Sequence, residues 1–340
     1  HEPWQGHPPV SDTAHPHLIS VDWGTTSLRC MLVDKNGAIL EQAKAERGIL
    51  KTGGVPFDQI LHEQIERFLP RFPDGEIVPV LMSGMIGSRQ GWQEAAYLRC
   101  PASPQKLAQS LQPVTTAGQS LTRCDVRIVP GMDIAEDVAA GALPDVMRGE
   151  ETQVFGAMLG AGVADGIFVL PGTHSKWVHV EAGTISRFRT YMTGEIYAAL
   201  LSSTILGHFA KSDSDDQEGF TFGVKTAERA GSHAAPGDLL NMAFTARSRV
   251  LHGELAEAAV RSYLSGLLIG AEILSATRHY AALPGPQTEH PFVVHVIGDD
   301  ALMQRYSKAA SLLGGSVEPA ITNPVPAAHL AIARLAGIVA

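Results

Sequence analysis

The sequence Ile19-Ser-Val-Asp-Trp-Gly-Thr-Thr-Ser-Leu-Arg-Cys-Met-Leu-Val33 decides the fold of this chain. It consists of two apolar runs of strand length on either side of a polar loop. The pair Asn36-Gly37 follows the second run and predicts a two-residue hairpin turn. A third strand is then expected over Ala38 to Ala45. The segment therefore predicts strand, polar loop, strand, tight turn and strand.

The polar loop has the composition of a phosphate-binding loop. Gly24 lets backbone N–H groups approach an anion closely, and the hydroxyls of Thr25, Thr26 and Ser27 add donors. Asp22 would repel a phosphate, so its presence is explained if a hard cation such as Mg²⁺ lies between the two. The alternative is a polar hairpin tip that binds no ligand.

A second segment repeats this arrangement nearly half a chain later. Residues Gly166 to Val180 again form an apolar run, a Gly-Thr-x-Ser loop and another apolar run. A turn at Glu181 to Gly183 and a third strand over Thr184 to Thr190 complete the unit. Two such loops, facing each other across a cleft, would hold a nucleotide from both sides.

Several motifs together resemble those of the 2-dehydro-3-deoxygalactonokinase family, within the actin, hexokinase and sugar-kinase superfamily. The resemblance runs from about Ile19 to the C-terminus. The motifs that carry it are Asp22-Trp-Gly-Thr-Thr-Ser-Leu-Arg29, Arg47-Gly-Ile49, Gly84-Met-Ile-Gly-Ser-Arg-Gln-Gly-Trp92, Pro144-Asp-Val-Met-Arg-Gly-Glu-Glu-Thr-Gln153, Leu170-Pro-Gly-Thr-His-Ser-Lys-Trp177 and Met192-Thr-Gly-Glu195.

The resemblance implies an α/β fold of two actin-like ATPase (ribonuclease H-like) domains. Each domain is expected to be a mixed five-stranded sheet flanked by helices, with the nucleotide in the cleft between the domains. The expected boundaries are a flexible tail over 1–17, an N-terminal domain over 18–160 and a C-terminal domain over 161–340. The resemblance also implies ATP-dependent phosphorylation of 2-dehydro-3-deoxy-D-galactonate at its 6-hydroxyl, in galactonate catabolism, with ATP and Mg²⁺ as cofactors.

The resemblance extends to the binding residues. Asp22 is expected to hold Mg²⁺, and the Gly-rich loop after the strand at 76–82 is expected to bind the sugar acid, with Arg89 as the partner of its carboxylate. The residues expected to bind the cofactor are Asp22, Gly24, Thr25, Thr26, Gly172, Thr173, His174, Ser175, Lys176, Gly298 and Asp299. The residues expected to bind the substrate are Ser83, Gly84, Arg89, Trp92, Arg148 and Glu195.

The catalytic base is expected near the end of the first domain, where kinases of this superfamily place an acid at a helix start after a glycine. A helix is predicted from about Val146 to Leu159, with Glu150 and Glu151 near its start. Glu151 is the first candidate and Glu150 the second, although relatives usually carry Asp. The competing acids are Asp133, Asp137 and Asp145.

Hydrophobic periodicity predicts the remaining elements. Thr193 is expected to cap a helix, and the acidic segment from Lys211 to Glu218 is expected to be a solvated loop. Helices are predicted over Val55 to Phe68, Pro104 to Leu111, Asp238 to Leu251, Glu254 to Thr277 and Val325 to Ile338, and strands over Glu76 to Met82, Val126 to Val129 and Phe292 to Ile297.

Composition excludes several classes of function. The 340 residues carry a net charge of −9, which argues against an electrostatic grip on nucleic acid or on an anionic membrane. The three cysteines form no Cys-x-x-Cys pair, and no apolar run reaches the roughly 18 residues of a membrane helix. We expect a cytoplasmic enzyme with a small-molecule substrate, for which a homodimer is one expected assembly.

Three other classes of protein remain open at this stage. The first is a kinase of the same fold for another small sugar, and the second is an actin-like filament or chaperone ATPase. The third is a sugar-sensing transcription regulator, for which the 18 residues before Ile19 are too few to form a helix-turn-helix domain.

Overall fold

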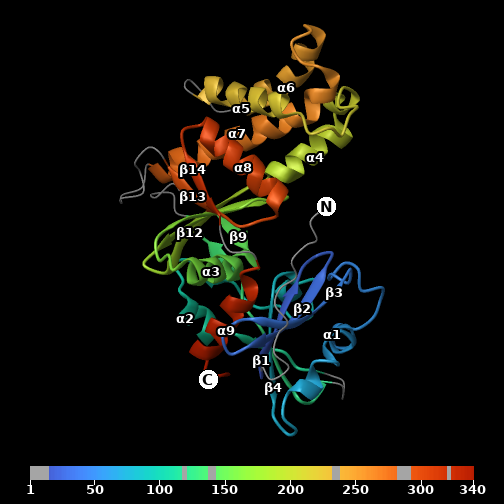
Figure 1. The fold of residues 1–340 in the computed structure, drawn as a ribbon, viewed down its shortest axis with the longest axis vertical. Coiled ribbons are helices and arrows are strands. Elements are labelled where there is room, and N and C mark those ends of the chain that lie inside the picture. The colour runs from blue at the N-terminus through green and yellow to red at the C-terminus, as the bar shows by residue number, and fades with distance from the viewer. Residues whose placement is uncertain (1–14, 117–120, 137–142, 232–237, 282–291, 320–322) are drawn as a thin grey trace, which may run out of the picture. The chain divides into compact units, whose positions relative to one another are not determined.

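A computed structural model describes the chain over residues 15–116, 121–136, 143–231, 238–281, 292–319 and 323–340 (Figure 1). The chain divides into two compact units. Unit 1 comprises His1–Val163, Gly183–Ile185 and Asn323–Ala340, and unit 2 comprises Ala164–Ala182 and Ser186–Thr322. The first boundary lies close to the expected one at residue 160. The last helix, however, groups with unit 1 and not with the C-terminal domain to which we had assigned it.

Unit 1 contains a six-stranded sheet with strand order β3-β2-β1-β4-β7-β6, and not the five strands that we expected. Strands β1, β2 and β3 form an antiparallel meander, whereas β4 runs parallel to both β1 and β7. The carboxyl ends of β1 and β4 therefore lie at the same edge of the sheet. The strands are β1 (Pro16–Trp23), β2 (Leu28–Asp34), β3 (Ile39–Ala45), β4 (Val78–Ser83), β6 (Gln112–Pro113) and β7 (Cys124–Ile128).

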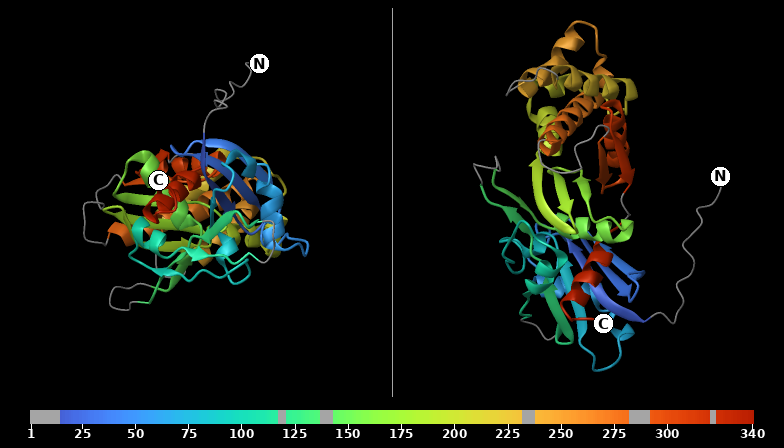
Figure 2. Two further views of the ribbon diagram at one scale, coloured as in Figure 1. Left: turned by 90° about the horizontal axis from the view of Figure 1, so that it is seen from below. Right: turned by 90° about the vertical axis from the view of Figure 1, so that its left-hand side faces the viewer.

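Both faces of the central strand β1 are covered, which explains its unbroken apolar run. On one face Ile19, Val21 and Trp23 join a core with helix α1 (Phe57–Ile65). On the other face helix α9 (Val325–Leu335) lies against β1, as the red helix beside the blue strands in Figure 2 shows. The strand begins at Pro16, so the expected tail is shorter than 17 residues, and its first 14 residues lie outside the described part of the chain.

The hairpin between β2 and β3 differs in detail from the prediction. Gly37 N–H donates to the Asp34 carbonyl oxygen at 3.1 Å, and Asp34 N–H donates to the Ala38 carbonyl oxygen at 3.0 Å. The turn is therefore centred on Lys35 and Asn36, and Gly37 follows it with φ +85°, a value that glycine adopts without strain. The predicted position of the turn is confirmed. The prediction that Asn36 and Gly37 form a two-residue loop is wrong.

The segment before the candidate base also differs from the prediction. Asp145–Met147 form strand β9 of a small sheet with β5 (Leu98–Arg99) and β8 (Met132–Ile134), and helix α3 (Glu150–Ala161) begins only after Gly149. Gly149 has φ +104°, so the chain cannot continue as one helix from 146. The predicted start of the helix at Val146 is wrong, and Arg148 does not share a helix face with Glu151. Helix α2 (Pro104–Gln109) confirms the short helix expected there.

Unit 2 contains a five-stranded sheet with strand order β12-β11-β10-β13-β14. Strands β10, β11 and β12 repeat the meander, and β13 runs parallel to β10. Its hairpin is the tight one, because Ala182 and Gly183 both have positive φ (47° and 72°). The strands are β10 (Gly166–Leu170), β11 (Ser175–Glu181), β12 (Thr184–Tyr191), β13 (Val293–Val296) and β14 (Ser316–Pro319).

Helices follow the sheet of unit 2. Helices α5 and α7 lie side by side, and Phe220, Val224, Ile269 and Ile273 pack with the sheet residue Val169 in one core (Figure 1). Helix α5 was not predicted from the sequence, and α7 begins six residues later than predicted. The helices are α4 (Thr193–Ser203), α5 (Gln217–Gly231), α6 (Asp238–Leu251), α7 (Val260–Ala281) and α8 (Asp300–Leu312).

The two sheets share one topology, an antiparallel meander whose first strand pairs in parallel with a later strand. This is the ribonuclease H-like arrangement of actin-like ATPases, so the predicted fold class is confirmed. None of the described helices is long and apolar enough to cross a bilayer. All three cysteines are free thiols, with Cys30 buried and Cys100 and Cys124 partly buried.

Candidate functional site

The first glycine-rich loop is the turn Gly24–Ser27, which follows β1. Its hydroxyl groups lie on the surface, and its backbone is held in place. Thr25 and Thr26 are exposed, while the carbonyl oxygens of Gly24 and Thr25 accept hydrogen bonds from Ile49 N–H (3.0 Å) and Leu50 N–H (3.1 Å). Gly48 lies so close to Thr25 and Thr26 that a Cβ there would collide with their backbone. The loop is therefore held by a neighbouring backbone segment, with its side chains free to meet a ligand.

Asp22 lies at the carboxyl end of β1, directly beside Ser83 at the end of the parallel strand β4. Burial raises the pKa of the Asp22 carboxyl, and the charge of Arg29 opposes that shift. Gly84 follows Ser83 with φ +93°, and a Cβ there would lie 2.8 Å from the Trp23 carbonyl oxygen. Asp22 therefore stands at the sheet edge where two strands end together.

The start of helix α3 joins the same edge. A Cβ at Gly149 would lie 3.1 Å from the Cα atom of Gly84, so the backbones of these two glycines are nearly in contact. Gly149 precedes Glu150 and Glu151, the first two residues of the helix. Unit 1 thus brings together Asp22, Gly84 and the two candidate bases at one point.

Glu151 and Glu150 lie in different surroundings. The Glu151 side chain is completely buried, and its two carboxyl oxygens accept hydrogen bonds from Gly149 N–H (2.7 Å) and the Thr152 hydroxyl (2.9 Å). Burial and the nearby charge of Glu150 raise the pKa of Glu151 to about 8. Glu150 is partly exposed, and its carboxylate accepts a hydrogen bond from Arg148 N–H at 2.9 Å. The two acids are thus distinguished by burial, as their adjacent helix positions predict.

The two arginines expected to bind the substrate differ sharply. Arg89 is exposed and pairs with Glu94 at 3.1 Å. Arg148 is buried, lies 4.3 Å from the ring centroid of Tyr97 and donates from Nη2 to the Ala95 carbonyl oxygen. Its Nε and Nη1 atoms have no hydrogen-bond partner among the described residues.

Two further residues expected to bind the substrate belong to the same region of unit 1. The Ser83 hydroxyl is buried and makes no hydrogen bond within the described part of the chain. Trp92 is half-buried, and its ring stacks on Phe57 with centroids 6.5 Å apart. Unsatisfied buried donors are uncommon in folded proteins, so Ser83 and Arg148 are the more informative pair.

The second glycine-rich loop is held differently from the first. Gly172 and Thr173 form its outer part, and Thr173 is exposed. Glu195 N–H donates to the Thr173 carbonyl oxygen at 3.0 Å. A Cβ at Gly194 would collide with the Gly172 carbonyl oxygen, so the start of helix α4 lies directly against the loop.

The side chains at the inner end of this loop are engaged within unit 2. Ser175 is completely buried, and its hydroxyl lies 3.0 Å from the Tyr306 hydroxyl. Lys176 is buried and donates to the Thr190 hydroxyl at 2.7 Å. His174 and Glu195, both half-exposed, pair with each other at 2.6 Å. Gly172 and Thr173 therefore present backbone and hydroxyl groups at the outer part of the loop.

A buried acid that the sequence analysis missed lies behind this loop. Glu272, in the middle of α7, accepts hydrogen bonds from Trp177 Nε1 (2.7 Å), from the Tyr306 hydroxyl (2.8 Å to Oε2) and from the Thr193 hydroxyl. The hydroxyl of Thr193 is thus used by Glu272 and does not cap helix α4, so that prediction is wrong. A lone Glu within an apolar helix was the available sequence signal.

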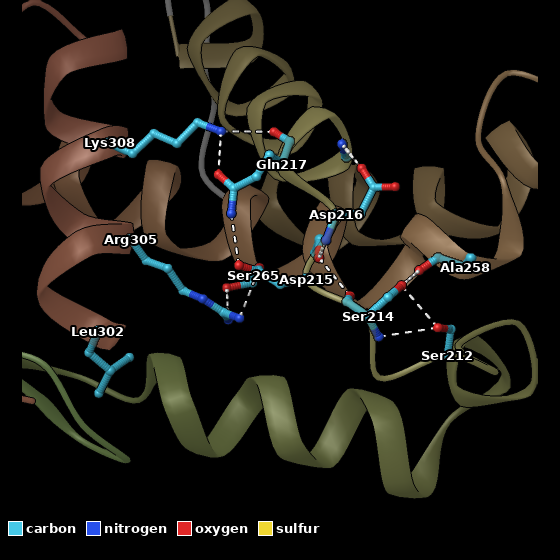
Figure 3. Close-up of polar contacts among 12 residues, drawn as sticks. Ser212, Ser214, Asp215, Asp216, Gln217, Ala258, Ser265, Leu302, Arg305 and Lys308 are labelled. Carbon is cyan, nitrogen blue, oxygen red and sulfur yellow. Dashed lines mark hydrogen bonds and ion pairs between the residues drawn. The ribbon is translucent and has the colours of Figure 1, made fainter. Parts of the chain in front are cut away.

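The start of α8 is the place expected to contact the nucleoside. The Asp299 carboxylate caps this helix by accepting from Leu302 N–H at 2.9 Å, and Gly298 is exposed. A cavity of about 190 Å³ lies one turn further along, between α8 and the start of α5. Figure 3 shows Arg305 and Lys308 of α8 reaching Asp215 and Gln217 across it. The acidic segment is a loop from Lys211 to Asp216, but Gln217 and Glu218 begin helix α5, and Asp215 is paired with Arg305 at 3.3 Å.

Two of the competing acids are engaged by other residues. Asp133 pairs with Arg99 at 2.9 Å, and Asp145 accepts a hydrogen bond from Val146 N–H at 2.7 Å. Asp137 lies outside the described residues. The described residues contain no cluster of three or more His, Cys, Asp or Glu side chains that suits a metal ion. A lone Asp22 suits Mg²⁺, which is commonly held by one or two carboxylates together with water and substrate phosphates.

The two ribonuclease H-like units, each with a glycine-containing loop after the first strand of its meander, give the chain the fold of the actin-like ATPases. The family model of the 2-keto-3-deoxy-galactonokinases matches residues 22–332. The chain belongs to this family.

Curated relatives and a solved structure agree with this assignment. The chain is 32% identical to a probable 2-dehydro-3-deoxygalactonokinase of Rhizobium meliloti (strain 1021), over 94% of this chain and 97% of the relative. It is 33% identical to the 2-dehydro-3-deoxygalactonokinase of Escherichia coli (strain K12), over 88% and 91%. A crystal structure from Sinorhizobium meliloti, provisionally named 2-dehydro-3-deoxygalactonokinase, matches with a TM-score of 0.78 and 29% identity over 95% of this chain and 99% of that one.

Proposed function

We propose that this protein transfers the γ-phosphoryl group of ATP to the 6-hydroxyl of 2-dehydro-3-deoxy-D-galactonate. Membership of the family supports the reaction class and the substrate. The structural observation that supports it most is the meeting of Asp22, Gly84 and Glu151 at one edge of the sheet in unit 1. Phosphoryl transfer needs a positioned hydroxyl, a base and neutralised charge, and that edge carries candidates for each role.

Glu151 is our candidate for the general base. A carboxyl with a pKa of about 8 is well matched to taking a proton from a hydroxyl near neutral pH. The hydrogen bonds from Gly149 N–H and Thr152 fix its orientation. Glu150 is the second candidate because it is more exposed.

Both phosphate loops are our candidates for binding the nucleotide. In unit 1 the backbone at Gly24 and the hydroxyls of Thr25 and Thr26 provide donors to phosphate oxygens. In unit 2 Gly172 and Thr173 provide the corresponding donors. Mg²⁺, when bound, neutralises phosphate charge, and Asp22 would hold it, directly or through water.

The buried inner residues of the second loop have a different role. Ser175 and Lys176 are engaged by Tyr306 and Thr190, so we assign them to fixing the loop and not to direct phosphate contacts. His174, paired with Glu195, orients the outer part of the loop.

The sugar acid is proposed to bind in unit 1 through Arg148 and Ser83. Both have buried donors without a partner among the described residues, and a guanidinium matches a carboxylate. Arg89 and Trp92 would line the same side, with Arg89 as the weaker candidate because Glu94 already neutralises it. For the nucleoside we propose the exposed backbone at Gly298 and Asp299.

A coupled ADP-release assay tests the reaction. Purified full-length protein with Mg·ATP should release ADP only when 2-dehydro-3-deoxy-D-galactonate is present. Gluconate and glucose serve as controls that lack the 2-keto-3-deoxy pattern or the carboxylate. ATP hydrolysis without any sugar acid, or faster turnover of glucose, would reject the proposed substrate. Location and assembly are separate proposals. Such a reaction would take place in the cytosol, where ATP is available. That the protein forms a homodimer stays a prediction.

A further inference from the structure

Helix α7 carries one carboxyl group into the interior of unit 2. Glu272 is only 3% exposed, and the neighbouring buried positions of the helix are Leu268, Ile269 and Ile273. An isolated carboxylate in such surroundings costs several kcal/mol unless hydrogen bonds compensate for its lost hydration. The Glu272 carboxyl group therefore depends on hydrogen-bond donors from the elements around it.

Three different elements donate hydrogen bonds to this carboxyl group. Trp177 Nε1 of β11 donates to Oε1 at 2.7 Å, and the Tyr306 hydroxyl of α8 lies 2.9 Å from Oε1 and 2.8 Å from Oε2. The Thr193 hydroxyl, at the first residue of α4, donates to Oε2. Glu272 therefore connects α7 with a strand and two other helices.

Two of these donors are also tied to the second glycine-rich loop. Tyr306 shares a hydrogen bond of 3.0 Å with the Ser175 hydroxyl, at the inner end of the loop. Thr193 precedes Gly194, which lies directly against the Gly172 carbonyl oxygen, and Glu195 N–H bonds the Thr173 carbonyl oxygen. Both ends of the loop are thus linked to the Glu272 carboxyl group, one through Tyr306 and the other through the start of α4.

We propose that Glu272 is a positioning residue that holds the Gly172–Ser175 loop, through Tyr306 and Thr193, in the conformation that receives the phosphates of ATP. This role rests on the proposed function, in which the loop contacts those phosphates. It differs from catalysis, because Glu272 acts on the loop through Tyr306 and Thr193, which donate hydrogen bonds to its carboxyl group. Loss of the network should loosen the loop, so nucleotide affinity should suffer while sugar-acid affinity should not.

The test compares three tyrosine and glutamate variants in the full-length protein. Glu272→Gln keeps the shape but presents an amide N–H₂ group to a set of donors, and Tyr306→Phe removes the link to Ser175. Tyr280→Phe is the matched control: Tyr280 is equally buried on α7, and its hydroxyl donates to the backbone carbonyl oxygen of Trp177 at 2.7 Å and not to the Glu272 carboxyl group. The dissociation constant of a non-hydrolysable ATP analogue is measured by calorimetry, with Tm and both KM values in parallel.

Glu272→Gln and Tyr306→Phe should each raise the dissociation constant for the analogue about tenfold, the effect of losing one well-made buried hydrogen bond. KM for the sugar acid should change less than about twofold, because the network supports the loop proposed to bind ATP and not the residues proposed to bind the sugar acid. Tyr280→Phe should lower Tm without changing nucleotide affinity. Equal losses of Tm in all three variants, with unchanged affinity for the analogue, would overturn the proposal. Failure of the wild-type protein to bind the analogue would instead reject the proposed function, and this role with it.

Discussion

The two glycine-rich loops occupy the same position in the same topology, yet they are held in different ways. The loop after β1 is held by backbone hydrogen bonds from Ile49 and Leu50, and it begins at a carboxylate, Asp22. The loop after β10 has no acid at that point, and a network of buried side chains centred on Glu272 lies behind it. The comparison teaches that this topology fixes where a loop is placed but not what supports it or what charge it carries.

The same contrast applies to the buried acids of the two units. Glu151 in unit 1 accepts hydrogen bonds from Gly149 N–H and the Thr152 hydroxyl, and it lies beside the charge of Glu150. Glu272 in unit 2 accepts bonds from Trp177, Tyr306 and Thr193, which partly oppose the rise in its pKa that burial causes. The roles we propose follow this difference: Glu151 binds and releases a proton, whereas Glu272 serves as a fixed acceptor. We therefore expect substitution of Glu151 in unit 1 to lower the rate of phosphoryl transfer. Substitution of Glu272 in unit 2 should instead disturb the conformation of the Gly172–Ser175 loop.

The largest expected effect is at Glu151. Glu151→Gln should lower kcat by about 10² to 10⁴, the range for loss of a general base, and should spare binding of ATP. Glu150→Gln is the matched control and should lower kcat far less. Steady-state rates and nucleotide titration measure both. Near-normal turnover of Glu151→Gln, with loss of activity in Glu150→Gln, would move the base to Glu150.

The second largest effect is expected for Asp22→Asn. This substitution should lower kcat by about 10²-fold, comparable to the loss of one preorganised electrostatic contact in other enzymes. The reason is that the amide is a poor ligand for Mg²⁺. The Mg²⁺ concentration that gives half of the maximal rate should rise in the same variant. Thr173→Val in the second loop should leave that concentration unchanged. An unchanged Mg²⁺ dependence in Asp22→Asn would remove the proposed difference in charge between the loops.

The pH dependence of stability should separate Glu151 from an ordinary glutamate. Its pKa is about 8 in the folded protein against 4.5 in the reference state, so folding favours the protonated form. The stability gained by protonation is present below pH 4.5 and is lost as pH rises through 8, by at most about 5 kcal/mol. Glu151→Gln should therefore gain stability relative to the wild type between pH 5 and pH 8, as measured by denaturant unfolding. A constant difference across this range would contradict the raised pKa.

The smallest expected effects test how each loop is supported. Gly48→Ala and Gly194→Ala each push a Cβ into the backbone of the loop it supports, and each should cost about 1–3 kcal/mol of stability. Both should also raise KM for ATP several-fold. Gly53→Ala is a useful control, because nothing lies within 4 Å of its Cβ position, although its φ of +64° adds some strain. Equal effects of all three substitutions would argue against loop support by close backbone approach.

Much of this molecule could be predicted from local sequence. The strand–loop–strand segments at Ile19–Val33 and Gly166–Val180 were found because both faces of their strands are buried, so apolar runs mark them clearly. The positions of both loops followed from motifs in those segments, whereas the position of the candidate base followed from the family resemblance of the motif at Pro144–Gln153. The error at Val146 arose because a single glycine with positive φ, Gly149, ends a strand and begins a helix within a few residues.

What the sequence by itself determined is the pair of meanders, their loops and the family, because these depend on residues close together along the chain. Only the tertiary structure decided that Glu272, Tyr306 and Thr193 meet Ser175, that Arg148 is buried while Arg89 is exposed, and that the last helix groups with unit 1. Such contacts join positions up to hundreds of residues apart. Periodicity and propensity carry no information about them, since burial and hydrogen bonding depend on which elements pack together.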